Sequence, residues 1–123
     1  MADSLYDEVG PSFFVSLVDA FYERVARDDL LRPMYPEDLT DAKRHLTLFL
    51  AQYWGGPSTY SHERGHPRLR MRHVPFTITP AARDAWIAAM DGALDTVRDR
   101  VSAGRFDELR EYLTSVARQL RNA

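Results

Sequence analysis

The chain has 123 residues, the size of one small domain, so we expect a single domain over residues 1–123. Hydrophobic residues make up 45% of the sequence and charged residues 28%, a composition typical of globular rather than disordered proteins. The net charge of −2 favours neither nucleic acid nor an anionic membrane as a partner, and the lack of cysteine excludes disulfides and thiol catalysis.

Apolar side chains repeat at helical spacing in four stretches of the sequence. The first helix is expected after Pro11, and the second is ended by Gly55-Gly56-Pro57. The third should begin at Thr79-Pro80, an N-cap residue followed by proline at the first helical position. The spacing predicts helices over residues 12–27, 39–53, 80–101 and 106–120.

Shorter helical turns are predicted over residues 4–9 and 28–32, the first because Ser4 and Asp7 have the spacing of a capping box. Residues 74–79 come closest to a strand, but Pro75 makes them a connector. The expected fold is therefore all-α. No stretch approaches the ~20 apolar residues of a membrane span, and a signal peptide is not evident, so we expect a cytoplasmic protein.

Residues 55–76 form a long, basic stretch that is interrupted by glycine and proline. A loop of this length in a small domain is usually functional or is held in place by a ligand. It contains the formal HExxH motif His62-Glu63-Arg64-Gly65-His66. This motif indicates a zinc-dependent hydrolase only when both histidines share one helix face, and here Gly65 and Pro67 favour a polar loop.

A second candidate is His73, which precedes the apolar residues Val74, Phe76 and Ile78. Such a histidine is either an ordinary packed or surface residue, or the single axial ligand of a haem iron. In the second case Arg72 and its basic neighbours would neutralise the haem propionates. Spacing alone does not decide between the two interpretations.

The sequence resembles the truncated haemoglobins of group II. The resemblance is carried by Tyr53-Trp54-Gly55-Gly56-Pro57, by His66-Pro67-Arg68-Leu69-Arg70-Met71-Arg72-His73 and by Trp86. Phe21-Tyr22 and Met34-Tyr35-Pro36-Glu37 extend it over about residues 5–120. It implies a truncated globin, a two-over-two helical sandwich around haem b. The sequence departs from the family at Gly10-Pro11, where members often have a glycine pair. This difference affects the expected angle of the first helix and not the haem site.

The resemblance also implies roles for individual residues. His73 would be the proximal iron ligand, and Tyr22, Tyr35 and Trp86 would lie on the distal side as donors to a bound ligand. Ala42 would occupy the usual distal-histidine position, where it cannot donate. The other haem contacts would be Leu46, Phe49, Tyr53, Met71 and Arg72, of which Leu46, Phe49 and Met71 are expected in the core.

The implied function is that of a haem protein that binds dioxygen, nitric oxide, carbon monoxide or peroxide. Three donors around the ligand predict slow dissociation, which favours nitric oxide dioxygenase or peroxidase-like chemistry over simple delivery. Repeated turnover would need a separate reductase, because the chain has no flavin or nicotinamide motif. The alternatives are a zinc-dependent hydrolase through residues 62–66 and a haem-free helical interaction module.

Overall fold

The computed structural model describes residues 4–123, and these residues form helices and turns without a strand. The all-α prediction is therefore confirmed. In chain order the elements are α1 (Leu5–Val9), α2 (Pro11–Arg27), η1 (Arg32–Met34), α3 (Thr40–Tyr53), α4 (Thr59–Arg64), α5 (Leu69–His73), α6 (Pro80–Val97), η2 (Arg98–Arg100) and α7 (Ala103–Leu120).

Local side-chain chemistry explains where several helices begin. The Ser4 hydroxyl accepts a hydrogen bond from the Asp7 N–H at 3.1 Å, as the capping-box spacing predicts. The Thr79 hydroxyl accepts one from the Ala82 N–H at 3.1 Å and so begins α6. Gly10 joins α1 to α2 with a φ of 76°, a conformation that glycine adopts without strain.

Two predicted boundaries are wrong, since α7 begins at Ala103 rather than Phe106 and α6 ends early, and one predicted turn is confirmed. α6 ends at Val97 rather than near Val101, because residues 98–100 form the separate turn η2 before the chain enters α7. The turn over residues 28–32 closes as expected, with the Arg32 N–H donating to the Asp28 carbonyl at 2.9 Å.

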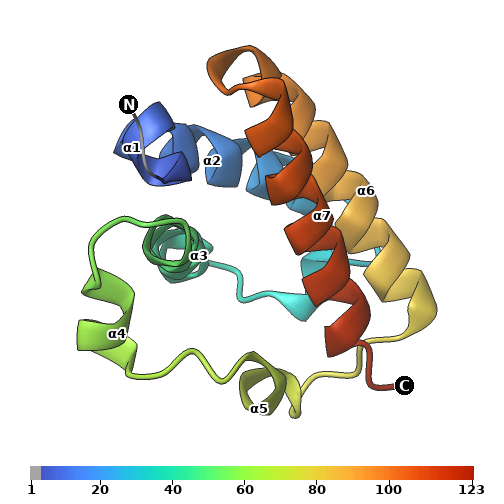
Figure 1. Ribbon diagram of the computed structural model, residues 1–123. Helices are drawn as coiled ribbons and strands as arrows, with labels where there is room; N and C mark the ends of the chain where they lie inside the picture. Colours follow the sequence, from blue (N-terminus) through green and yellow to red (C-terminus); the bar gives the residue numbers. More distant parts are fainter. Residues whose placement is uncertain (1–3) are drawn as a thin grey trace.

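The four long helices form a frame of two packed pairs (Figure 1). α2 packs against α3 and against α6, and α6 lies antiparallel beside α7. This is the two-over-two globin sandwich that was expected. α4 and α5 lie outside the frame, on the stretch of chain that joins α3 to α6 (Figure 1). Within residues 4–123, no helix is long and apolar enough to cross a membrane.

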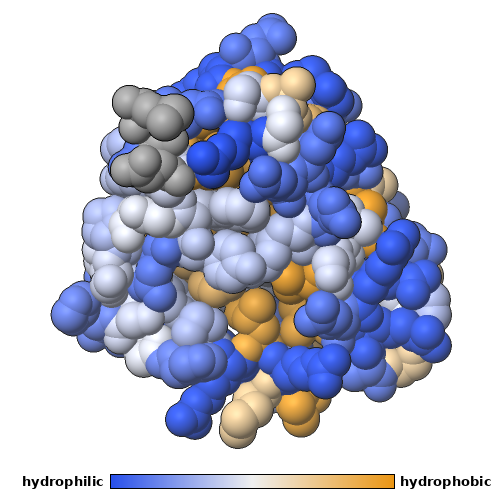
Figure 2. Space-filling view, in the orientation of Figure 1, coloured by the Kyte–Doolittle hydropathy of each residue, from blue (hydrophilic) through white to orange (hydrophobic). Residues whose placement is uncertain are grey.

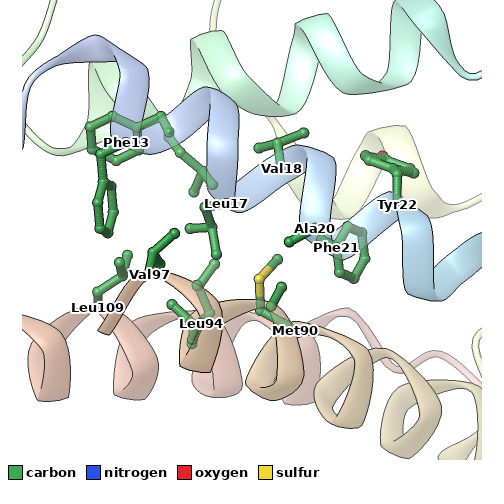
Figure 3. Packing of buried hydrophobic residues seen from close by; sticks show 14 of the residues in the cluster. Phe13, Leu17, Val18, Ala20, Phe21, Tyr22, Met90, Leu94, Val97 and Leu109 are labelled. Carbon is green, nitrogen blue, oxygen red and sulfur yellow. The ribbon is translucent and has the colours of Figure 1, made fainter. Parts of the chain in front are cut away.

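The core follows α2. Leu17 and Phe21 have no exposed surface and pack toward Met90 and Leu94 of α6, with Leu109 of α7 alongside (Figure 3). Each fully buried side chain of this size contributes about 1.5–3 kcal/mol. The contact between α2 and α6 is therefore strongly packed. It fixes the position of the side chains on the remaining faces of these two helices.

Candidate functional site

A largely apolar cavity of about 280 Å³ lies between the helical frame and α5. α2, α3, α5, α6 and α7 all contribute to its lining. Hydrophobic side chains gather in the lower half of the molecule in Figure 2, in the region above α5. Leu46 and Phe49 of α3 line the cavity, in keeping with their expected place on its apolar side.

The three predicted donors meet in this cavity. Tyr22 comes from α2, Tyr35 follows η1 and Trp86 comes from α6, and all three line the cavity. The Tyr22 and Tyr35 rings meet edge to face, with their centroids 5.5 Å apart. The Trp86 indole is also 5.2 Å from the core ring of Phe21, measured between centroids. Helices that are far apart in sequence thus bring the three polar aromatic side chains together.

Both phenols are protonated at neutral pH, since the ordinary pKa of tyrosine is about 10, and burial moves their ionisation further into the alkaline range. It raises the pKa of Tyr22 well above its ordinary value, and the neighbouring Tyr35 adds to the shift. It also raises the pKa of Tyr35 to about 12, although a hydrogen bond with Trp86 opposes the change. Each phenol therefore retains an O–H that can donate a hydrogen bond.

His73 lines the same cavity from the last position of α5. Its Nδ1 lies 2.6 Å from the carbonyl oxygen of Leu69, one helical turn earlier. A carbonyl oxygen can only accept, so Nδ1 of the neutral ring carries the proton and Nε2 keeps its lone pair. A backbone carbonyl on one ring nitrogen is the usual partner that orients a histidine as a metal ligand through the other.

The donor set fits a haem better than a bare metal ion. No group of three His, Asp or Glu side chains that could hold an ion occurs among residues 4–123. A single imidazole suits an iron whose other ligands come from a macrocycle, and an apolar cavity suits the macrocycle itself. His73, Leu46 and Phe49 are the residues on its lining that would hold such a group.

Met71 was expected in the core, but this prediction is wrong, because 66% of its surface is exposed. The reason is the geometry of α5. Leu69 and His73 are four residues apart, share one face and both line the cavity. Met71, two residues from each, points away from that face.

Tyr53, Ala42 and Arg72 also lie outside the cavity lining. The Tyr53 ring is 53% exposed and stacks on Tyr112, with centroids 4.1 Å apart. Arg72 donates from Nε to the Pro67 carbonyl at 2.7 Å and from Nη2 to the Arg64 carbonyl at 2.8 Å. These bonds tie α5 to the end of α4, and the propionate contact of Arg72 stays a prediction.

Sequence reasoning missed the contribution of α7 to the cavity. Tyr112, Leu113 and Val116 line it, together with Phe76 and Ile78 from the connector after α5. The helical spacing of Leu113 and Val116 does mark a buried face. The same spacing predicts ordinary helix packing, however, so no signal in it separates a cavity wall from a core.

The HExxH segment does not form a zinc site. His62 lies within α4, which contradicts the expected loop, whereas His66 lies outside a helix as expected. Gly65, with a φ of 77°, ends α4 between the two histidines, so they do not share a helix face. Glu63 forms a two-pronged ion pair with Arg44 of α3 and is not aimed at either histidine.

Known proteins match almost the whole chain. The bacterial-like globin family matches residues 4–122. The Group 2 truncated hemoglobin YjbI of Bacillus subtilis (strain 168) is 47% identical over 108 residues, which cover 88% of this chain and 77% of that protein.

Solved structures agree with this match. A thermostable hemoglobin from the actinobacterium Thermobifida fusca is 48% identical, with a TM-score of 0.93 over 98% of both chains. The truncated oxygen-avid haemoglobin from Bacillus subtilis is 42% identical, with a TM-score of 0.91 over 98% of this chain and 100% of that one. The similarity therefore includes the fold, the sequence and nearly the full length of both chains.

Proposed function

Since the chain belongs to the bacterial-like globin family, as a truncated haemoglobin of group II that binds haem and diatomic gases, we propose that it retains dioxygen for oxygen-dependent chemistry. The observation that carries the proposal is the meeting of Tyr22, Tyr35 and Trp86 in the cavity that His73 also lines. A protein that only delivered oxygen would gain nothing from three donors that slow its release.

Each of these side chains has a separate task. The Nε2 of His73 would bind the iron of haem b, and the Leu69 carbonyl would hold the ring in place. Haem b, when bound, supplies an iron at which dioxygen, nitric oxide, carbon monoxide or peroxide binds. The Tyr22 O–H and the Trp86 N–H would donate to a ligand that becomes partly negative on binding. The single Trp86 N–H donates to the Tyr35 hydroxyl in the structure, so it would have to turn from Tyr35 to the ligand when the ligand binds.

We propose oxidation of nitric oxide to nitrate as the first reaction, and peroxidase-like turnover as the second. In both cases Tyr22 and Trp86 would donate hydrogen bonds toward the oxygen substrate, and the apolar lining of the cavity would limit access of water. A separate reductase in the cytoplasm would return the protein to its ferrous state. Arg72 would assist by binding a haem propionate.

The two alternatives are supported less well. A zinc-dependent hydrolase needs both His62 and His66 on one helix face, and Gly65 separates them. A haem-free interaction module would have no use for a cavity lined by a histidine and three polar aromatic side chains.

Absorption spectra of the haem-loaded protein in ferric, ferrous, oxygen-bound and carbonyl forms test the proposal. We expect a Soret band in every form and an oxygen-bound spectrum that persists after removal of free oxygen. Mixing the oxygen-bound form with nitric oxide should yield nitrate in equal amount. Absence of a Soret band would contradict the haem site, and absence of nitrate would contradict the first reaction.

A further inference from the structure

The chain is unusually basic around α5. Residues 64–83 contain five arginines and no aspartate or glutamate, although the whole chain has 16 Lys and Arg against 18 Asp and Glu. Arg68 and Arg70 are exposed, and within residues 4–123 no carboxylate pairs with either of them. The nearest acidic residue upstream, Glu63, is already paired with Arg44. The two guanidinium groups therefore project a local positive field from a protein of net negative charge.

Apolar side chains lie exposed beside these arginines. Met71 is 66% exposed, Val74 73% and Phe76 47%. Only Phe76 of these three lines the cavity, so a group bound in the cavity would leave Met71 and Val74 in contact with water. Exposed apolar side chains that cluster in this way mark an interaction site more often than chance exposure does. We call Arg68, Arg70, Met71, Val74 and Phe76 together the α5 face.

We propose that the α5 face docks a small acidic electron-transfer protein, an inference that rests on the proposed function and identifies the kind of reductant it needs. An apolar centre with charged residues around it is the usual make-up of a transient interface, and the arginines select an acidic partner. One electron leaves the reduced flavin or iron–sulfur centre of the partner and reduces the ferric haem protein to the ferrous state. No bond forms or breaks, and no proton moves.

The α5 face also offers a short route to the cavity. The rings of Phe76 and His73 have centroids 6.5 Å apart, and both line the cavity. Phe76 is at the same time part of the exposed surface. A partner seated on Met71 and Val74 would therefore lie against the residues that connect the surface to the proposed iron ligand.

Two other occupants fit these observations less well. α5 has five residues, too few for the amphipathic helix with which peripheral proteins usually lie on a membrane. A second copy of this chain, packed symmetrically, would bring the Arg68 and Arg70 side chains of both copies together, and like charges at an interface oppose binding.

The test uses the haem-loaded protein and an acidic [2Fe–2S] ferredoxin as the probe. Calorimetric titration at low ionic strength should give a Kd in the micromolar range that weakens at physiological ionic strength. Arg68→Glu/Arg70→Glu should weaken binding at least about tenfold, since close charge pairs dominate such encounters. Val74→Ser, which changes no charge, should weaken it about threefold or more.

A matched control separates the face from the overall charge. Arg27→Glu/Arg110→Glu changes the net charge equally but alters exposed residues of α2 and α7, outside the α5 face; it also breaks the surface ion pair of Arg110 with Asp91, so its carbonyl spectrum is checked first. This variant should bind the ferredoxin within about twofold of the unchanged protein, because its charges are screened over such distances. The rates of reduction by reduced ferredoxin, measured by stopped flow, should rank the variants in the same order as their affinities for ferredoxin.

Four outcomes would overturn the proposal: no binding of the ferredoxin, equal weakening in both double variants, binding to phosphatidylglycerol vesicles instead, or a dimer that Val74→Ser dissociates. Reduction by dithionite and the carbonyl spectrum should be unchanged in Val74→Ser and in Arg27→Glu/Arg110→Glu. A failure of the proposed function would be visible separately, as the absence of an oxygen-bound spectrum in the unchanged protein.

Discussion

Two walls of the same cavity are built in opposite ways. The wall that we propose as distal carries Tyr22 of α2 and Trp86 of α6, whose contact forms the core, and Tyr35, which follows η1 and packs against that core. The proximal wall, which carries His73, is a five-residue helix and its connector, with Val74 exposed to water. The distal side chains are held by packing, whereas few apolar contacts hold the proximal one.

The difference follows from what each wall must do. A hydrogen-bond donor helps a ligand most when its orientation is fixed before the ligand arrives. A metal ligand makes a strong bond, and that bond can itself order the segment that carries it. The distal wall therefore needs the rigid helices, and the proximal wall can be completed by its cofactor.

The stretch that joins α3 to α6 also has two halves that are held in different ways. Its first half is held by the protein alone: Tyr60 is 4% exposed, and Gln52 of α3 bonds to Ser61 through both the Ser61 N–H at 2.9 Å and its hydroxyl at 2.7 Å. Its second half is tied to Asn122, whose side chain donates to the Phe76 carbonyl at 2.8 Å and accepts from the Ile78 N–H at 2.8 Å.

The largest expected effect comes from removing the proximal ligand. His73→Ala should abolish stable haem binding, or leave binding that depends on added imidazole, because Nε2 of His73 is the proposed iron ligand. His62→Ala and His66→Ala should bind haem normally. Absorption and resonance Raman spectra of the ferrous forms check this, and a normal histidine–iron stretch in His73→Ala would show the assignment to be wrong.

A smaller effect is expected from one hydroxyl of the distal wall. A hydrogen bond to a charged group contributes about 1.5–3 kcal/mol, so Tyr22→Phe should speed dioxygen dissociation roughly 10–150-fold. Trp86→Phe should act in the same direction, and carbon monoxide, which carries less charge when bound, should respond much less. Stopped-flow dissociation of both gases measures these rates.

The matched control for this prediction is Tyr60→Phe. Tyr60 is buried like Tyr22, but it belongs to α4 and does not line the cavity. Its loss of a hydroxyl should leave the dioxygen dissociation rate within about twofold of the unchanged protein. Unchanged rates in Tyr22→Phe and Trp86→Phe would make these residues packing residues only.

Hydrogen exchange should separate the two halves of the joining stretch. On haem binding we expect amides of residues 68–78 to gain about tenfold or more in protection, because the bond at His73 stabilises that segment. Amides of residues 59–64 should change little, since α3 already holds them. The sequence suggested that a ligand holds residues 55–76 in place as a whole, and equal gains in both halves would favour that broader interpretation.

Loss of the Asn122 side chain should have a modest effect on the proximal wall. Asn122→Ala removes three exposed hydrogen bonds to residues 73–78 and should lower the stability by about 1–2 kcal/mol, or roughly 3–8 °C in Tm. Haem loss should become severalfold faster. The control is Gln119→Ala, which removes one exposed hydrogen bond within α7. It should change neither the stability nor the rate of haem loss.

The smallest effect is confined to alkaline solution. Burial raises the pKa of Tyr35 from 10.0 to about 12, so the unfolded chain ionises first. The free energy of unfolding should therefore not depend on this group below pH 10, and should fall as the pH rises from 10 to about 12. In denaturant titrations, the free energy of unfolding of Tyr35→Phe should fall less between pH 10 and about 12 than that of the unchanged protein. An equal fall would mean that other groups cause it.

Sequence reasoning succeeded where one chemical rule decided the outcome. Helical spacing and capping residues located the four long helices, and the resemblance to the group II truncated haemoglobins indicated Tyr22 and Trp86, which line the cavity. It failed for Met71, because the face that a five-residue helix turns inward depends on where the helix docks. The stacking of Tyr53 on Tyr112 of α7 could not be predicted from spacing either, and the haem contact of Tyr53 stays a prediction.

The bonds of Asn122 could not be predicted at all. They join residues 44 to 49 positions apart, and no local pattern indicates a pairing over that distance. The α4 helix was not predicted either. Gly65 and Pro67 indicate a loop, but here they follow the end of a short helix.

The position of Asn122 also sets an order of events when the chain is made. During synthesis the ribosome releases α2 early, but the distal wall stays incomplete until α6 follows. The connector after α5 waits longer, because its partner Asn122 lies 44 to 49 residues further along the chain. Long-range contacts of this kind form late in folding. We therefore expect the nascent chain to form the contact of α2 with α6 first, and to capture its cofactor only once Asn122 has emerged from the ribosome.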